Sequence, residues 1–140
     1  MRAKWKRSRR WVLLAAVLLT TCGLPVSCAA SSLWGTGEPR PVDCAEALAY
    51  AHATLPDRAE DVHCTELRWR DTFVEAEFRL PRPEATAWLA ETFPSAEVSE
   101  GGLRYHATFG PEEGKAHEVG VTLRYEGGDT ALVRVVGHDS

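Results

Sequence analysis

"EDVHCTELRWRDTFVEAEFRLP" (residues 60–81) is a segment in which apolar and charged residues alternate twice. In its first half, Leu67 and Trp69 are separated and flanked by charged residues. In its second half, the apolar positions are again separated by single residues: Val74, Ala76, Phe78 and Leu80. Because a period of two is typical of half-buried strands, we expect two strands joined by a tight turn at Asp71-Thr72.

The first of these strands contains an irregularity. Val62 and Cys64 are at even-numbered positions, whereas Leu67 and Trp69 are at odd-numbered positions. Since successive side chains of a strand point to opposite faces, a regular strand cannot turn all four toward the core. We therefore expect either a bulge near Thr65 or a change of face along this strand.

A helical pattern precedes the two strands, in "DCAEALAYAHATLP" (residues 43–56). Asp43 can cap this helix, Glu46 completes a capping-box pattern, and Pro56 ends it. The apolar stripe at helical spacing consists of Cys44, Leu48, Ala51 and Leu55.

A second helix and three further strands follow. The helix is predicted over "RPEATAWLAETFP" (residues 82–94), where Pro83 suits the first turn. The strands are predicted at 103–109, 119–125 and 130–137, and "EGGD" (126–129) is a hairpin turn between the last two. The last run is apolar on both alternations, which is typical of a central strand.

The order α-β-β-α-β-β-β predicts an α+β fold, with an antiparallel sheet of about five strands and two helices on one face. The other face would carry mixed charges, including Glu66, Glu75 and Glu77. Such a face is either a solvated, ion-paired surface or a binding face for an acidic partner. In the second case, the candidate binding residues are Arg68, Arg70, Arg79, Arg104 and Arg124.

The N-terminal segment predicts export. "MRAKWKRSRR" (residues 1–10) contains six Lys or Arg residues and no acidic residue, and an uncharged run extends from residue 11 to the next charge at Glu38. A basic start followed by an apolar stretch is typical of an export signal. "SRRWVL" (residues 8–13) also resembles a twin-arginine signal.

Three fates of this segment remain open. A retained anchor would place Trp11 and Trp34 at the two membrane interfaces. Lipidation would use Cys28 or Cys22, each of which follows a short run that partly matches a lipobox. Cleavage near Ala30 would release the protein. All three place the rest of the chain outside the cytoplasm, most simply at the outer face of the cell membrane.

The chain therefore divides into a signal or anchor (1–30), a linker (31–41) and a single small extracytoplasmic domain (42–140). Without the six basic residues at its start, the chain has ten basic and twenty acidic residues, a net charge of −10. This charge argues against nucleic acid and against adhesion to an anionic membrane surface. We expect a monomer that contacts the membrane through its N-terminal segment and has a possible protein partner in the envelope.

Cys44 and Cys64 lie beyond the N-terminal segment, where an oxidising compartment favours a disulfide. The alternative is a metal site that also uses His52 and His63, but the closely spaced ligand pairs that zinc prefers are absent. We therefore predict a disulfide and no metal site.

No catalytic motif is present in the sequence, and we expect no catalytic residues and no cofactor. The favoured hypothesis is a non-enzymatic binding or accessory domain. The alternatives are a small cell-envelope enzyme with an unfamiliar site and a secreted inhibitor-like domain.

Two segments carry a resemblance. "TLPDRAEDVHC" (residues 54–64), which leads into the hairpin, and "FRLPRPEATAWLAETFP" (residues 78–94) resemble a pattern in small exported actinobacterial lipoprotein-like proteins of unknown function. The resemblance covers residues 54–94 and implies an exported location and the fold class.

Overall fold

The structure is a computed structural model that describes residues 37–99 and 103–139. The predicted signal or anchor (1–30), with Cys22 and Cys28, lies outside the described residues, as does the linker up to residue 36. Within the described residues, no helix is both long enough and apolar enough to cross a membrane.

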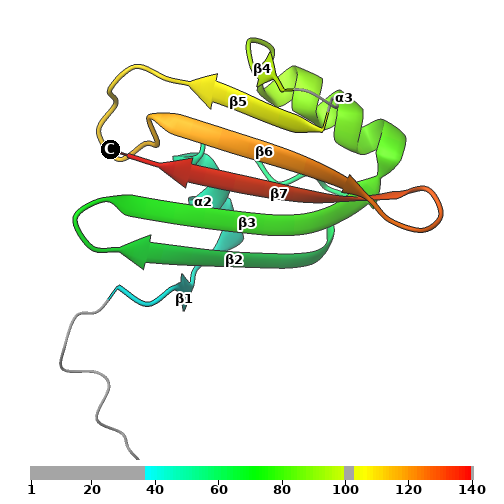
Figure 1. Ribbon diagram of the computed structural model, residues 1–140. Helices are drawn as coiled ribbons and strands as arrows, with labels where there is room; N and C mark the ends of the chain where they lie inside the picture. Colours follow the sequence, from blue (N-terminus) through cyan, green and yellow to red (C-terminus); the bar gives the residue numbers. More distant parts are fainter. Residues whose placement is uncertain (1–36, 100–102, 140) are drawn as a thin grey trace, which may run out of the picture. The chain divides into compact units, whose positions relative to one another are not determined.

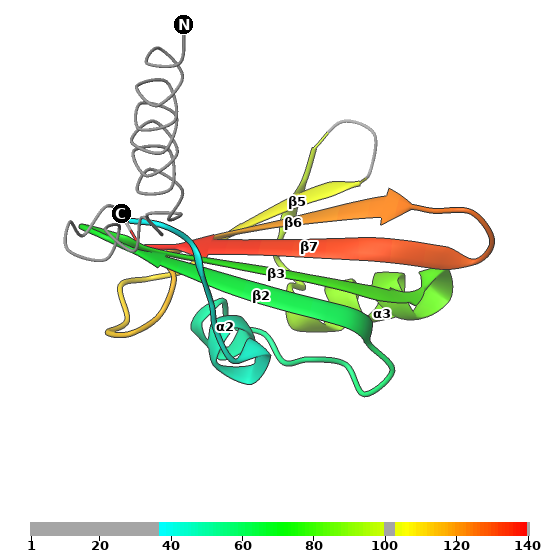
Figure 2. The same ribbon diagram turned by 90° about the horizontal axis from the view of Figure 1, so that it is seen from below.

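The described residues form an α+β fold with one antiparallel sheet and two helices, as predicted. The strand order is β1-β2-β3-β7-β6-β5-β4 (Figure 1). Within the described residues, both helices lie on the same face of the sheet (Figure 2). We call the other face, which neither of these helices covers, the open face. The elements are β1 (Arg40–Pro41), α2 (Cys44–Tyr50), β2 (Glu60–Arg68), β3 (Thr72–Pro81), α3 (Arg82–Thr92), β4 (Glu97–Val98), β5 (Arg104–Thr108), β6 (Glu118–Tyr125) and β7 (Thr130–His138).

The sheet has seven strands instead of about five, because a two-residue strand is added at each edge. β1 is formed by Arg40 and Pro41, which the sequence assigned to the linker. Arg40 lies opposite Glu66 on β2, and an ion pair joins their side chains. β4 pairs with β5 through Glu97 and Val98. Neither short strand has an alternation that a sequence pattern could reveal.

The core lies between the sheet and the two helices. β3 contributes every second side chain to it, as the alternation predicted, and β7 lies centrally between β3 and β6. The largest fully buried side chains are Phe78, Leu48, Leu80, Leu123, Val119, Val133 and Val135.

The face of β2 differs from the expectation. Cys64 and Glu66 point into the core, whereas Leu67 is half-buried and Trp69 is 76% exposed. The prediction that Leu67 and Trp69 face the core is therefore wrong. The irregularity in pairing lies between Glu60 and His63, where Asp61 has a positive φ of 50°, and not near Thr65. The disulfide explains this choice, because Cys64 must face α2 to reach Cys44.

The disulfide between Cys44 and Cys64 is confirmed. It joins the first turn of α2 to the middle of β2, with 5.3 Å between the two Cα atoms. Both thiols are used by this bond, so the alternative metal site that needed them is not formed.

Helix α2 is shorter than predicted. Asp43 caps it as expected, since its Oδ1 accepts hydrogen bonds from the backbone nitrogens of Ala45 and Glu46. The helix ends at Tyr50, and His52 has a positive φ of 56°, the left-handed conformation that terminates helices. Leu55 consequently leaves the predicted apolar stripe and is 36% exposed.

The hydroxyl of Tyr50 supports a prediction about pH. It donates to the carbonyl oxygen of Thr72 at 3.2 Å. Burial, together with the nearby Asp139 carboxylate, raises the pKa of Tyr50 to about 12 from 10.0. Because the folded state holds this proton more tightly than the unfolded chain, the stabilising contribution is complete below pH 10 and is lost as the pH rises toward 12.

We expect urea unfolding between about pH 9 and pH 12 to show a decline in stability that is steeper in the wild type than in Tyr50→Phe. The variant keeps the ring and serves as the control for every other alkaline titration. Equal slopes in the two proteins would contradict the role of this hydroxyl.

Candidate functional site

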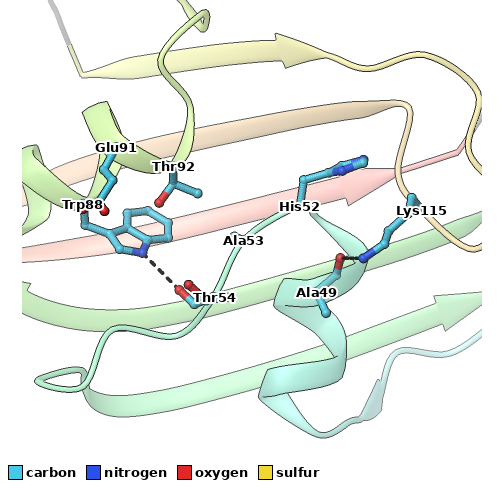
Figure 3. Close-up of a pocket in the computed structure, with 8 residues that line it drawn as sticks. All are labelled: Ala49, His52, Ala53, Thr54, Trp88, Glu91, Thr92 and Lys115. Atoms are coloured by element: carbon cyan, nitrogen blue, oxygen red, sulfur yellow. Dashed lines mark hydrogen bonds between the residues drawn. The ribbon is translucent and has the colours of Figure 1, made fainter.

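A cavity of about 570 Å³ opens on the helix-covered side of the sheet (Figure 3). Three segments form it: the end of α2 with the chain that follows, the second half of α3, and the connection between β5 and β6. Its lining residues are Ala49, His52, Ala53, Thr54, Trp88, Glu91, Thr92 and Lys115.

His52 is fixed at one side of the cavity. Its left-handed backbone turns the chain after α2, and its ring stacks on Phe109 with 3.9 Å between ring centroids and 13° between planes. Its Nε2 lies 2.9 Å from the carbonyl oxygen of Ala116. Since a carbonyl oxygen only accepts hydrogen bonds, Nε2 is the donor in this contact.

Trp88 forms a wall on the other side. Its Nε1 donates to the carbonyl oxygen of Thr54 at 3.1 Å. The indole also makes edge contacts with Phe78 and Phe93, at centroid distances of 5.4 and 6.0 Å. Because the ring is held from the core side and by a hydrogen bond, it is a preformed apolar surface.

Opposite charges lie on the two sides of this cavity. Glu91 follows Trp88 by three residues on α3, so both side chains lie on the same side of that helix. Lys115 lies beside His52, and its Nζ donates to the carbonyl oxygen of Ala49 at 2.5 Å (Figure 3). An ammonium group has three donors, so this contact leaves two for a ligand. Among residues 37–99 and 103–139, no ion pair joins Glu91 to a cation.

The cavity presents charged, polar and aromatic groups together. Its eight lining residues include a carboxylate, an ammonium group, an imidazole, an indole and two hydroxyls, but no cysteine or serine. Across the described parts of the chain, no three His, Cys, Asp or Glu side chains are close enough to hold a metal ion.

The five arginines predicted as a binding face do not form one surface. Arg68 lies on the helix-covered side, where its Nε donates to the buried Glu66 at 2.6 Å. Arg70 lies in the turn after β2, with its guanidinium 5.6 Å from the centre of the Trp69 ring. Arg104 lies on the open face, opposite Thr122 on β6.

The other two arginines lie on the open face and are neutralised there. Arg79 bonds to Glu126 at 2.8 Å and to Asp61 at 3.1 Å, and Arg124 contacts Glu126 at 3.4 Å. The bond from Arg79 lowers the pKa of the Glu126 carboxyl below its usual value. These contacts are those of an ion-paired sheet surface.

Sequence reasoning missed several residues. Arg134 on β7 donates two hydrogen bonds to Glu75, at 2.9 and 2.7 Å. Its position within the predicted strand 130–137 could have assigned it to the open face of the sheet. His52 was considered as a metal ligand, but not as part of a cavity. Nothing in the sequence places Trp88 and Glu91 of α3, or Lys115 of the β5–β6 connection, beside His52.

The buried carboxylate of Glu66 is a further unexpected feature. The residue is 5% exposed, and its two oxygens are bound by Arg40 at 2.9 Å and Arg68 at 2.6 Å. Burial by itself raises the pKa of Glu66, but the hydrogen bonds and charges of the two arginines outweigh burial and lower it. The carboxylate is therefore ionised and ties β1 to the sheet.

Comparison with known proteins does not assign a family or a ligand to this cavity. No family model, no curated protein and no solved structure matches the chain.

Proposed function

We propose that this protein is an exported, envelope-tethered, non-enzymatic binding domain whose ligand occupies the cavity between α2 and α3. The basic start and the long uncharged run support export. The disulfide supports it independently, because such bonds persist in oxidising compartments.

The observation that carries the binding role is the arrangement of charge in the cavity. Glu91 and the Trp88 ring lie on one side, and Lys115 and His52 lie on the other (Figure 3). A carboxylate beside an indole face suits a cationic group, and an ammonium group suits an anionic one. We therefore propose a small zwitterionic ligand, such as a short peptide with free termini.

The open face of the sheet supports the acidic-partner hypothesis less well. Arg79, Arg124 and Arg134 each already bind a carboxylate. An acidic partner would have to compete with these carboxylates for the same guanidinium donors. The favoured interpretation of this face is a solvated surface.

Calorimetry of the full chain with the dipeptide alanyl-valine tests the proposal. We expect Glu91→Gln and Lys115→Met each to weaken binding about tenfold, since a charged hydrogen bond contributes roughly 1.5 kcal/mol. N-acetylation of the dipeptide should cause the same loss in the wild type as in Lys115→Met. It should cause little further loss in Glu91→Gln, because the partner of the amino group is already absent there.

Glu112→Gln is the matched control. Glu112 is an exposed carboxylate that does not line the cavity. Its removal changes the net charge by the same amount and should leave the affinity unchanged. A loss of affinity in Glu112→Gln equal to that in Glu91→Gln, or full-strength binding of the N-acetylated dipeptide, would contradict the proposed site.

A further inference from the structure

An exposed aromatic group lies where β2 turns into β3. Trp69 is 76% exposed and Phe73 is 39% exposed, although most large apolar side chains of this domain are buried. Arg70 covers part of the Trp69 ring, and Leu67 lies opposite Phe73 on the open face. We call Leu67, Trp69, Arg70 and Phe73 the Trp69 surface.

The described chain begins against this surface. A Cβ atom added at Gly37 would lie 2.9 Å from Cδ1 of Leu67 and 3.4 Å from Cβ of Trp69. The N-terminal segment therefore joins the domain beside Trp69. Whatever its conformation, the chain between Cys28 and Gly37 spans at most about 30 Å, and the chain between Cys22 and Gly37 at most about 50 Å.

The opposite end of the sheet gives a comparison. The turn between β6 and β7 lies at the other end of the strands from the turn between β2 and β3 (Figure 1). There Tyr125 is 45% exposed, and the guanidinium of Arg82 lies 4.6 Å from its ring centre. The two ends thus carry similar pairs of an arginine and an aromatic ring. They are separated by the length of β3, about 30 Å at 3.3 Å per residue.

We propose that the Trp69 surface is a second membrane contact, which lays this end of the domain on the lipid interface beside its own tether. The proposal rests on the tethering part of the proposed function. A tryptophan with an adjacent arginine is a combination that the interfacial region of a bilayer accommodates, because the indole is amphipathic and the guanidinium binds phosphate. The short tether keeps Trp69 at a high local concentration near lipid, so a weak contact is sufficient.

The domain's net negative charge decides the lipid class. Electrostatic attraction cannot be the main contribution for a domain with twice as many acidic as basic residues. The contact must depend on insertion of the aromatic group, and it should form on zwitterionic phosphatidylcholine.

Fluorescence quenching by lipid tests this contact. The full chain is reconstituted into phosphatidylcholine vesicles whose acyl chains carry bromine near the headgroup, and into matched vesicles without bromine. The emission of Trp69 is obtained as the difference between the wild type and Trp69→Phe. We expect bromine to reduce this emission about twofold, as an interfacial position requires. We also expect vesicles to protect it from an aqueous quencher.

The matched control moves the reporter to the far end of the sheet. In Trp69→Phe combined with Tyr125→Trp, the indole at position 125 should show no bromine quenching. Flotation of every variant with the vesicles reports the tether separately. Flotation with an unquenched Trp69 overturns the second contact alone, as does equal quenching at position 125. A chain that does not float overturns the tether and this inference together.

Discussion

Removal of the Cys44–Cys64 disulfide is expected to lower the free energy of unfolding by about 3 kcal/mol, because the bond closes a loop of this size in the unfolded chain. The two cysteines are 20 residues apart in the sequence. The corresponding fall in melting temperature is about 15 °C for a domain of roughly 100 residues. The measurement is thermal unfolding, by circular dichroism, of the wild type and of Cys44→Ser combined with Cys64→Ser.

The chain contains its own control for this experiment, because it has a second pair of cysteines. Cys22→Ser combined with Cys28→Ser changes the same number of thiols, both outside the domain. It should leave the melting temperature of the domain unchanged. Free thiols at Cys44 and Cys64 in protein taken from intact cells would contradict the disulfide in the exported protein.

The disulfide also shows what the sequence can predict. The helical spacing of apolar residues predicted that Cys44 faces the core, and the alternation along β3 predicted four buried residues. Both predictions use local periodicity, which can be recognised in the sequence without knowledge of the tertiary fold. The alternation along β2 could not predict which of its side chains face the core, because Leu67 and Trp69 form one alternating set and Cys64 belongs to the other. The long-range disulfide to α2 turns the set that contains Cys64 toward the core.

The cavity was not predictable for a different reason. His52 enters it because the helix ends early in a left-handed turn, and Lys115 enters it from the β5–β6 connection. His52 lies in the segment that the sequence predicts as helix (43–56), where no left-handed turn was expected, and Lys115 lies in no periodic segment. The two residues meet only through the tertiary fold.

Three of the five candidate arginines do lie on the open face of the sheet, namely Arg79, Arg104 and Arg124. Arg68 lies on the helix-covered side because it shares the alternation of Cys64, which the disulfide turns toward α2. Arg70 lies in the turn, where a strand pattern assigns no face.

The buried carboxylate of Glu66 gives the second large expected effect. Arg40→Ala combined with Arg68→Ala should lower the free energy of unfolding by about 2 kcal/mol, because it leaves a buried carboxylate without partners. We expect less than the full cost of breaking a buried ion pair. The side chains of Arg40 and Arg68 are 64% and 66% exposed, so water can partly replace them.

The pH dependence of stability distinguishes this cause from a simple loss of packing. In the wild type the arginines lower the pKa of Glu66, so its contribution is present above the usual glutamate pKa and is lost as the pH falls through the lowered value. In the double variant only burial remains, which raises that pKa, so acid should recover stability by protonating the carboxylate. Adding Glu66→Leu to the double variant should also restore stability, since an apolar residue of similar size suits this buried position. A double variant with the stability and pH profile of the wild type would mean that Arg40 and Arg68 do not hold Glu66, and that β1 is tied to the sheet by its backbone pairing alone.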